Sequence, residues 1–341
     1  MKINEVADFV GYGELYKNNG YVKPQDFQAA LFAAGIPSVN FYQEMEMYSR
    51  YVNAHMDENR GGDIVQLHSH SFYEILYTQS GRIQYLLGDE RYSLKQGDIV
   101  FVPPGLSHRP LISAPLEEPY RRYVLWISAE YIEQIRGISP GDNIVPSEGK
   151  ILRTRGTSMG EILHQHFRQA VDENSRKAPG WQSALYAAAL QTLVQLHRAL
   201  CDIRAHTPAA EKQELLDDVL GYIKSHLSDK ITLKDTARKF LVSESTVSQL
   251  FRKRLGVSFY HCVTQYRLIE AKNLITDGVA PGSIYGRVGF ADYSAFYRAF
   301  KQEYGMSPRE YRGWRNTAAD ETRRSLIIAD SSSAAGATER Q

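Results

Sequence analysis

The chain has 341 residues, of which 43% are hydrophobic and 11% aromatic, so we expect two or three domains with buried cores rather than a disordered protein. Its net charge of +1 conceals an asymmetry: residues 228–315 hold 15 Lys and Arg against 8 Asp and Glu, which gives +7 there and −6 elsewhere. No apolar run reaches the ~18 residues of a membrane span, no signal peptide is visible, and two cysteines cannot build a disulfide framework, which together predict a cytoplasmic protein with no membrane segment.

Residues 62–128 are typical of short β-strands. Runs rich in β-branched and aromatic residues lie at 81–87, 91–94, 99–102 and 123–127, and Gly, Asp and Pro turn signals separate them. Strands at this spacing predict a barrel or a sandwich.

Residues 158–205 are typical of helices. An apolar stripe recurs at spacings of three and four residues and therefore shares one helical face. It comprises Leu185, Ala189, Leu193, Leu196 and Leu200. The stripe is either core or a dimer seam. Residues 206–212 have the composition of a linker, and the tail from residue 317 has that of a disordered segment.

A weak internal repeat with an offset of 49 residues lies in the basic segment. Each copy predicts a helix that begins after an N-cap residue, Ser243 or Asp292, and ends at a glycine, Gly256 or Gly305. The pattern over residues 263–276 predicts an amphipathic helix between the two copies, with a length of about 20 Å. It would hold the two repeated helices near the ~34 Å spacing of successive major grooves.

Both repeated helices have a polar face with basic residues at its end, as a helix needs in order to read base edges in a major groove. The expected base-reading residues are Ser245, Ser248, Gln249 and Arg252 in the first helix, and Ser294, Tyr297 and Arg298 in the second. The expected phosphate contacts are Lys253, Arg254 and Lys301. The alternative is that these are solvated faces of an all-α bundle.

Three histidines and one glutamate form a candidate site in the strand region: His68, His70, Glu74 and His108. On a strand, residues 68, 70 and 74 would share one face, and His108 would join them from a neighbouring strand. Such a set suits a divalent ion such as zinc, iron, manganese or nickel. Three interpretations stay open: hydrogen-bonded barrel residues, a small-molecule pocket with Trp126 or a tyrosine as a stacking face, or a metal site with or without catalysis.

Residues 288–296 (Val-Gly-Phe-Ala-Asp-Tyr-Ser-Ala-Phe), followed by Phe300, Gly305 and Ser307-Pro308, resemble the signature of AraC-type transcription regulators. The spacing of the histidine motifs resembles the paired motifs of the cupin barrel, although Ile112 replaces the terminal Asn of the second motif. The chain also departs from the AraC pattern at Tyr285, where a small residue is usual, and at Pro281 and Gly282.

The two resemblances imply an α+β multidomain protein with a cupin-like β-barrel, a helical linker and an all-α tandem helix-turn-helix domain. The expected boundaries are 1–155 for ligand sensing, 156–212 for the helical linker or dimerisation region, 213–316 for DNA binding and 317–341 for a disordered tail. They imply a dimeric transcription regulator of promoter DNA, with RNA polymerase as a further partner and a sugar or similar polar metabolite as effector. No cofactor is required, although the barrel could hold a divalent metal.

Two other functions remain alternatives at this point. One is a metal-dependent cupin enzyme, an isomerase or dioxygenase, with an appended DNA-binding module. The other is an interaction protein whose helices recruit another protein without DNA.

Overall fold

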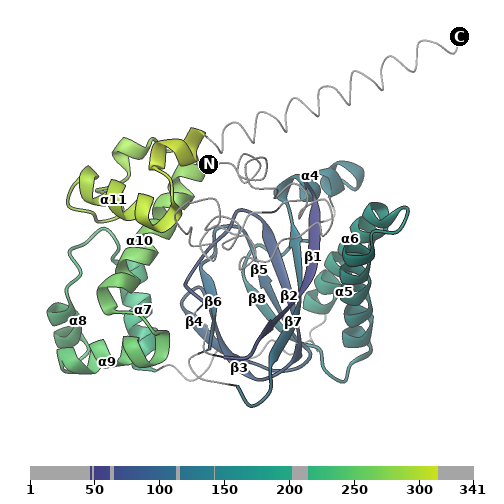
Figure 1. Cartoon of the computed structure of the whole chain (residues 1–341), viewed down its shortest axis with the longest axis horizontal. Coiled ribbons are helices and arrows are strands. Elements are labelled where there is room, and N and C mark those ends of the chain that lie inside the picture. The colour runs from purple at the N-terminus through teal and green to yellow at the C-terminus, as the bar shows by residue number, and fades with distance from the viewer. Residues whose placement is uncertain are drawn as a thin grey trace, which may run out of the picture.

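The computed structural model describes residue 47 and residues 50–61, 65–112, 116–141, 143–201 and 214–313. The predicted linker at 206–212 and the predicted disordered tail at 317–341 lie outside these residues. The described chain forms two β-sheets with three helices, followed by a group of helices on the other side of the sheets (Figure 1). None of the described helices is long and apolar enough to cross a bilayer.

The larger sheet has five antiparallel strands in the order β1-β7-β2-β5-β8. They are β1 (Val52–Asn59), β2 (Tyr73–Ser80), β5 (Asp98–Val102), β7 (Tyr120–Ile127) and β8 (Lys150–Arg153). In this register Glu74 lies opposite Trp126 on one side and Val102 on the other. Because directly opposed residues project to the same face of a sheet, Glu74 and Trp126 point the same way.

The smaller sheet has three antiparallel strands in the order β4-β3-β6. They are β3 (Ile83–Leu87), β4 (Glu90–Leu94) and β6 (His108–Leu111). Leu76 and Val124 of the larger sheet share one buried core with Tyr85 and Leu94 of the smaller one. The predicted β-rich fold is confirmed, but strand pairing among the described residues gives two separate sheets and does not close them into one barrel.

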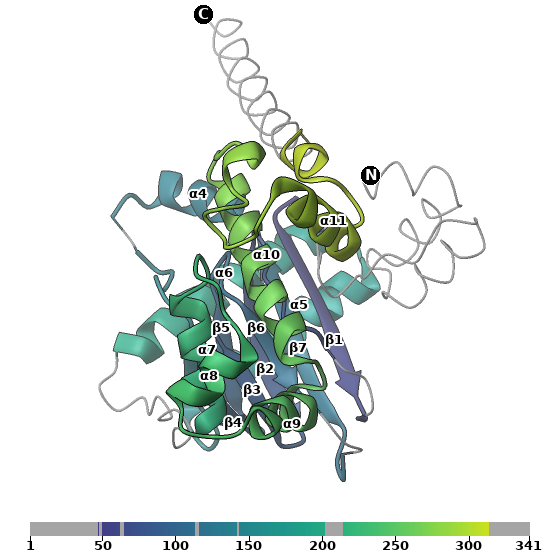
Figure 2. The ribbon, with the colours of Figure 1, turned by 90° about the vertical axis from the view of Figure 1, so that its left-hand side faces the viewer.

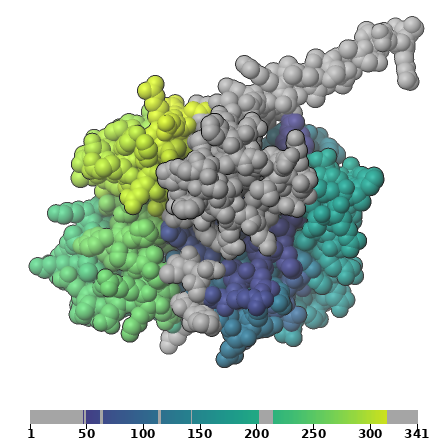
Figure 3. Space-filling view, in the orientation of Figure 1, coloured from purple at the N-terminus to yellow at the C-terminus, as the bar shows by residue number. Residues whose placement is uncertain are grey.

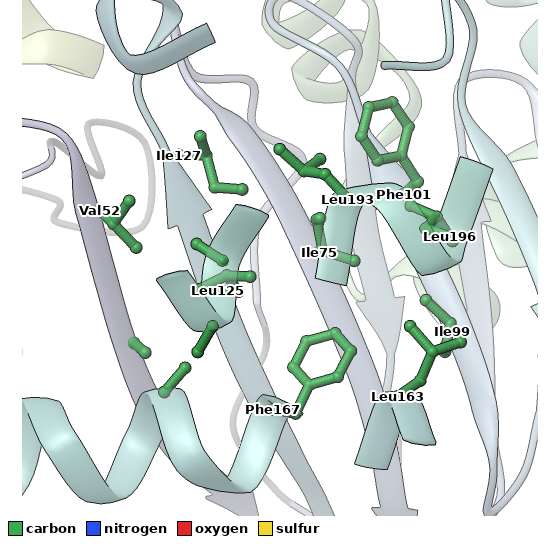
Figure 4. Close-up of a cluster of buried hydrophobic side chains, with 14 of the residues drawn as sticks. Val52, Ile75, Ile99, Phe101, Leu125, Ile127, Leu163, Phe167, Leu193 and Leu196 are labelled. Carbon is green, nitrogen blue, oxygen red and sulfur yellow. The ribbon is translucent and has the colours of Figure 1, made fainter. Parts of the chain in front are cut away.

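Helices cover the opposite face of the larger sheet. These are α4 (Ala129–Ile138), α5 (Ser158–Arg176) and α6 (Trp181–Cys201). Figure 4 shows Leu163 and Phe167 of α5 and Leu193 and Leu196 of α6 packed against the strands. Leu185, Leu193 and Leu196 are at most 1% exposed, and each such burial contributes about 1.5–3 kcal/mol. Of the two roles predicted for the leucine stripe, the core role is confirmed.

In the described C-terminal part, residues 308–313 are helical, and five further α-helices precede them. They are α7 (Leu215–Ser225), α8 (Leu233–Lys239), α9 (Glu244–Leu255), α10 (Phe259–Thr276) and α11 (Tyr293–Tyr304). The predicted caps are confirmed: the side chains of Ser243 and Asp292 accept hydrogen bonds from Thr246 N and Ala295 N. Gly256 and Gly305 end α9 and α11 in the left-handed conformation, with φ of 70° and 71°.

Helix α10 belongs to both C-terminal units, which explains why it is buried nearly all round. Its first half contributes Phe259 and Tyr266 to the core around α7, α8 and α9, and its second half contributes Leu268 and Ile275 to the core around α11. Figure 2 shows α10 lying across the sheets, with α11 near one of its ends.

The second C-terminal unit differs from the first before its long helix. Where the first unit has α8, the second has a 3-10 turn at Pro281–Ser283 and further turns up to Gly289. Pro281 is the first residue of that turn, where its missing N–H costs nothing, and the following Gly282 disfavours a helix. Tyr285 packs partly buried against the core that contains Phe296. The departures in sequence thus coincide with a departure in structure.

Candidate functional site

The outer face of α9 is available to a partner. Ser245, Gln249, Arg252 and Lys253 are exposed and Ser248 is partly exposed, whereas the opposite face (Val247, Phe251 and Leu255) is buried. The N-cap at Ser243 and the left-handed Gly256 define both ends of the helix, and an N-cap of this kind contributes about 1 kcal/mol. The predicted polar stripe of the first unit therefore lies on the surface.

Helix α11 has the same arrangement. Ser294, Arg298 and Lys301 are exposed and Tyr297 is partly exposed, while Phe296 and Phe300 are fully buried. The Phe296 and Phe300 rings pack edge to face with centroids 5.6 Å apart, a favourable geometry for aromatic pairs. Both helices thus present polar and basic side chains outward from a rigid core.

Arg254 is placed differently from the other basic residues of α9. Its Nη2 donates to Glu214 Oε2 at 2.9 Å, and the same carboxylate oxygen lies 3.2 Å from Nη2 of the buried Arg91 of β4. The sequence predicted Arg254 as a phosphate contact because it is one of the basic residues at the end of this helix, and neither Glu214 nor Arg91 is near it along the chain to signal a partner. In the structure its guanidinium holds α9 against α7 and the smaller sheet.

His70, Glu74 and His108 converge in the buried space between the two sheets. Their ligand atoms all lie within 4.8 Å of one another. Glu74 Oε2 lies 3.1 Å from His108 Nε2 and 3.7 Å from His70 Nε2. Burial raises the pKa of Glu74, but hydrogen bonding and the charges of His108 and His70 outweigh it and hold this pKa well below its usual range. The carboxylate therefore stays ionised.

The backbone fixes the tautomers of these histidines. His70 Nδ1 donates to Phe72 O at 2.8 Å, and His108 Nδ1 donates to Leu106 O at 2.9 Å. Because a carbonyl only accepts, Nδ1 carries a proton in both rings, and Nε2 is the ring atom that faces Glu74. Burial lowers the pKa of His70, and the hydrogen bond to Glu74 opposes that shift. Once both Nε2 atoms are deprotonated, they and the Glu74 carboxylate oxygen form a set of three converging acceptors, an arrangement that suits a cation.

His68 takes a different position from the one that strand spacing predicted. His68 and His70 precede β2, which begins at Tyr73, and His68 pairs with His108 through an isolated bridge. The prediction that 68, 70 and 74 share a strand face was wrong, because the chain bends between His70 and Tyr73. His68 Nδ1 donates to Gln66 O at 2.9 Å, and the ring packs edge to face on His108 with centroids 4.3 Å apart. His68 thus supports His108 and lies outside the convergent set.

Trp126 lies beside the cluster, as expected, but it contacts the cluster through the indole N–H and not through the face of its ring. Its Nε1 donates to Glu74 Oε1 at 2.8 Å, and its ring is 2% exposed. The indole packs against His55 and Phe72, with centroids 4.8 and 4.9 Å away. Trp126 therefore orients the carboxylate.

Sequence reasoning missed a second polar group on the inner face of the larger sheet. Arg122 Nη2 donates to Asp57 Oδ2 at 2.9 Å, and its Nη1 donates to Asn59 Oδ1 at 2.6 Å. His55 Nε2 lies 3.7 Å from Asp57, and the Arg122 guanidinium stacks over Tyr120, 5.0 Å from its centroid. The available signal was the alternation of inward-facing and outward-facing residues along β1 and β7. It was missed because no strand was predicted over residues 52–59.

Two family models match the chain. A helix-turn-helix domain model matches residues 236–313, and an AraC-like ligand binding domain model matches residues 61–222. The chain is 27% identical over 258 residues to the HTH-type transcriptional activator RhaR of Yersinia pestis (bv. Antiqua, strain Angola), which covers 72% of this chain and 83% of the relative. It is 25% identical over 249 residues to the HTH-type transcriptional regulator YdiP of Escherichia coli (strain K12), with coverages of 70% and 78%.

The chain is also similar to several solved structures. Wild-type ToxT from Vibrio cholerae strain SCE256, with unsaturated fatty acid bound, is 14% identical, covers 79% of this chain and 97% of its own, and has a TM-score of 0.35. The C-terminal domain of AraT from Geobacillus stearothermophilus is 31% identical, covers 29% of this chain and 84% of its own, and has a TM-score of 0.29.

Proposed function

Because the chain belongs to the AraC family of helix-turn-helix transcription regulators, with an AraC-like ligand-binding domain before its DNA-binding domain, we propose that it binds promoter DNA under the control of a small polar effector. The observation that carries this proposal is the pair of exposed polar helix faces, α9 and α11, on two units joined by α10. The matched relatives are named as transcription regulators, which favours a regulator over the enzyme alternative.

In this proposal α9 and α11 enter adjacent major grooves. Gln249 and Arg298 are exposed near the middle of their helices, where a side chain can reach base edges, with the serines and Tyr297 beside them. Exposed Lys253 and Lys301 lie one turn further on, where they would meet phosphates. We assign Arg254 to the ion pair with Glu214 in place of the phosphate contact expected from the sequence.

The proposed effector site lies between the two sheets, which would together act as a cupin-like barrel. The inner face there combines hydrogen-bonding groups (His55, Asp57, Arg122) with buried aromatic rings (Tyr85, Trp126). Convergent polar groups in an apolar setting are typical of small-molecule sites. A sugar or similar polar metabolite fits this mixture, because its hydroxyl groups both donate and accept.

A divalent metal is a second candidate ligand of this domain. The donor set of His70 Nε2, His108 Nε2 and Glu74 Oε2 fits a borderline ion such as zinc. The hydrogen bonds from both Nδ1 atoms and from Trp126 are the outer contacts that orient ligands at metal sites. The ion would supply positive charge to three converging acceptors.

The assembly follows from the family. We propose a cytoplasmic homodimer that acts on RNA polymerase at the promoter, with the domain boundaries expected from the sequence. The buried leucines of α6 are committed to the core of their own chain, so the dimer contact must use other residues.

A thermal-shift screen of the full chain tests the effector proposal, because a ligand that binds only the folded state raises the melting temperature. The screen uses sugars and other polar metabolites, and a ligand present at about 100-fold its Kd would add about 2.7 kcal/mol to the free energy of unfolding. A hit should lose its effect in Arg122→Leu and keep it in Arg82→Leu, an exposed control. If hits shift both variants equally, the effector does not bind between the sheets.

A further inference from the structure

The histidine cluster lies beneath the contact between the sheets and the C-terminal helices. Leu67 and Leu86 of the sheet domain belong to the same buried core as Val219 of α7 and Tyr266 of α10, and the green C-terminal helices rest directly on the sheet domain (Figure 3). A backbone shift around the cluster would therefore displace side chains that pack directly against the C-terminal helices.

The segment that carries His70 is bound to α10. Ser69 O accepts a hydrogen bond from Lys272 Nζ at 3.2 Å; Lys272 and Ser69 are 7% and 3% exposed. His70 O accepts from Gly105 N at 2.8 Å, and Gly105 O in turn accepts from Asn273 Nδ2 at 3.2 Å. The backbone on both sides of the His70 side chain thus makes polar contacts that lead to α10.

The strand that carries His108 is bound to α9. Adjacent strand residues point to opposite faces, so His108 faces Glu74 while Arg109 faces the helices. Arg109 Nη2 donates to the carbonyl oxygen of Leu255 at 3.0 Å, and Arg109 is 4% exposed. Leu255 is the last residue of α9, where the carbonyl groups at a helix C-terminus favour a positive charge. The short strand β6 therefore connects the histidine cluster to α9.

We propose that a divalent transition-metal ion bound by His70, Glu74 and His108 regulates DNA binding by shifting these two contacts. The inference rests on the metal-binding proposal above. Ligand atoms around a tetrahedral ion lie about 3.4 Å apart, whereas the three atoms here are spread over up to 4.8 Å. Binding would draw the His70 and His108 segments together, and Ser69 and Arg109 would move with them, away from Lys272 and Leu255. A cavity of about 690 Å³ is lined by both His70 and Lys272, so the histidine segment and α10 border the same open space.

The test measures DNA binding by the full chain with and without zinc, on duplexes that the protein itself selects from a random pool. We expect zinc to change the DNA Kd by at least about fivefold, the lower end of typical coupling between sites. Zinc should also speed hydrogen exchange in α9 and α10 as their contacts with the sheets loosen. DNA should change the affinity for zinc by the same factor, since coupling is reciprocal.

Variants separate coupling from binding. Lys272→Met and Arg109→Met keep apolar bulk but lose the donors, so they should bind zinc and DNA while zinc changes the DNA Kd by less than about twofold. Lys224→Met removes an exposed ion pair with Asp89 (3.0 Å) that also joins the two parts but touches no histidine segment, so it should keep the full response. His70→Ala should lose both zinc binding and the response.

The proposal is overturned if the full chain binds no zinc, if zinc binds without changing DNA affinity or exchange, or if Lys224→Met loses as much coupling as the other two variants. The exchange measurement on the unmodified chain decides the matter even if a buried variant fails to fold. Loss of DNA binding under every condition would instead refute the proposed function itself.

Discussion

Trp126 Nε1 donates a hydrogen bond to Glu74 Oε1 at 2.8 Å, from the strand adjacent to that of Glu74 and directly opposite it in register. This bond occupies one carboxylate oxygen and leaves Oε2 facing His70 and His108. A single indole therefore determines which way the only carboxylate of the convergent set points.

Trp126→Phe should lower the free energy of unfolding by about 1.5–3 kcal/mol, since a buried charged acceptor loses its donor while most of the packing remains. It should also weaken zinc binding by about 10–100-fold. Denaturant titration and calorimetry measure the two effects. An unchanged zinc affinity would show that the indole does not orient Glu74 for the ion.

Gln249→Ala should relax sequence preference at one or two base pairs, with discrimination there reduced by about 1–3 kcal/mol. The reason is that Gln249 lies exposed on the outer face of α9, where an amide can pair with a base edge. Binding of a panel of single-base variants of the selected site measures it. Gln302→Ala, an exposed residue of α11 outside the predicted stripe, serves as the control and should leave the preference unchanged.

Lys253→Ala should weaken binding to all sequences alike, because its exposed ammonium is assigned to phosphate. The slope of log K against log salt should fall by about 1. Titrations over a series of salt concentrations give the slope. A sequence-dependent loss would mean that Lys253 reads bases.

Acid should weaken the sheet domain through Asp57. Burial raises the pKa of this carboxyl, but the neighbouring Arg122 charge, together with the charge and hydrogen bond of His55, outweighs burial and lowers the pKa to about 2. The ionised form stabilises the fold fully above the unfolded value near 4, and this contribution, about 2 kcal/mol, is lost as the pH falls from there toward 2. The stability difference between the original chain and Asp57→Asn should therefore shrink over that range. Parallel pH profiles for the two proteins would contradict the assignment.

Local signals predicted much of the C-terminal domain. Ser243 and Gly256 lie at the two ends of α9 because capping depends on hydrogen bonds within a few residues, and the same holds for Asp292 and Gly305. The leucines of α6 were recognised because helical periodicity records the buried face.

Contacts between distant segments could not be predicted in the same way. The pairing of Arg254 with Glu214 and the bond from Arg109 to Leu255 join residues 40 and 146 positions apart, and nothing in their neighbours signals a partner. His68 was misplaced because alternation is informative only within a strand, and the bend before Tyr73 resets it.

The central claim is that α9 and α11 read two successive major grooves. Chemical footprinting of the full chain on its selected duplex tests it most directly, by mapping protected major-groove purines. The account predicts two protected patches about 10 base pairs apart, with protection weakened at one or two purines of one patch in Gln249→Ala and of the other patch in Arg298→Ala. A single patch, or two patches in which neither substitution weakens the protection of any purine, would contradict it.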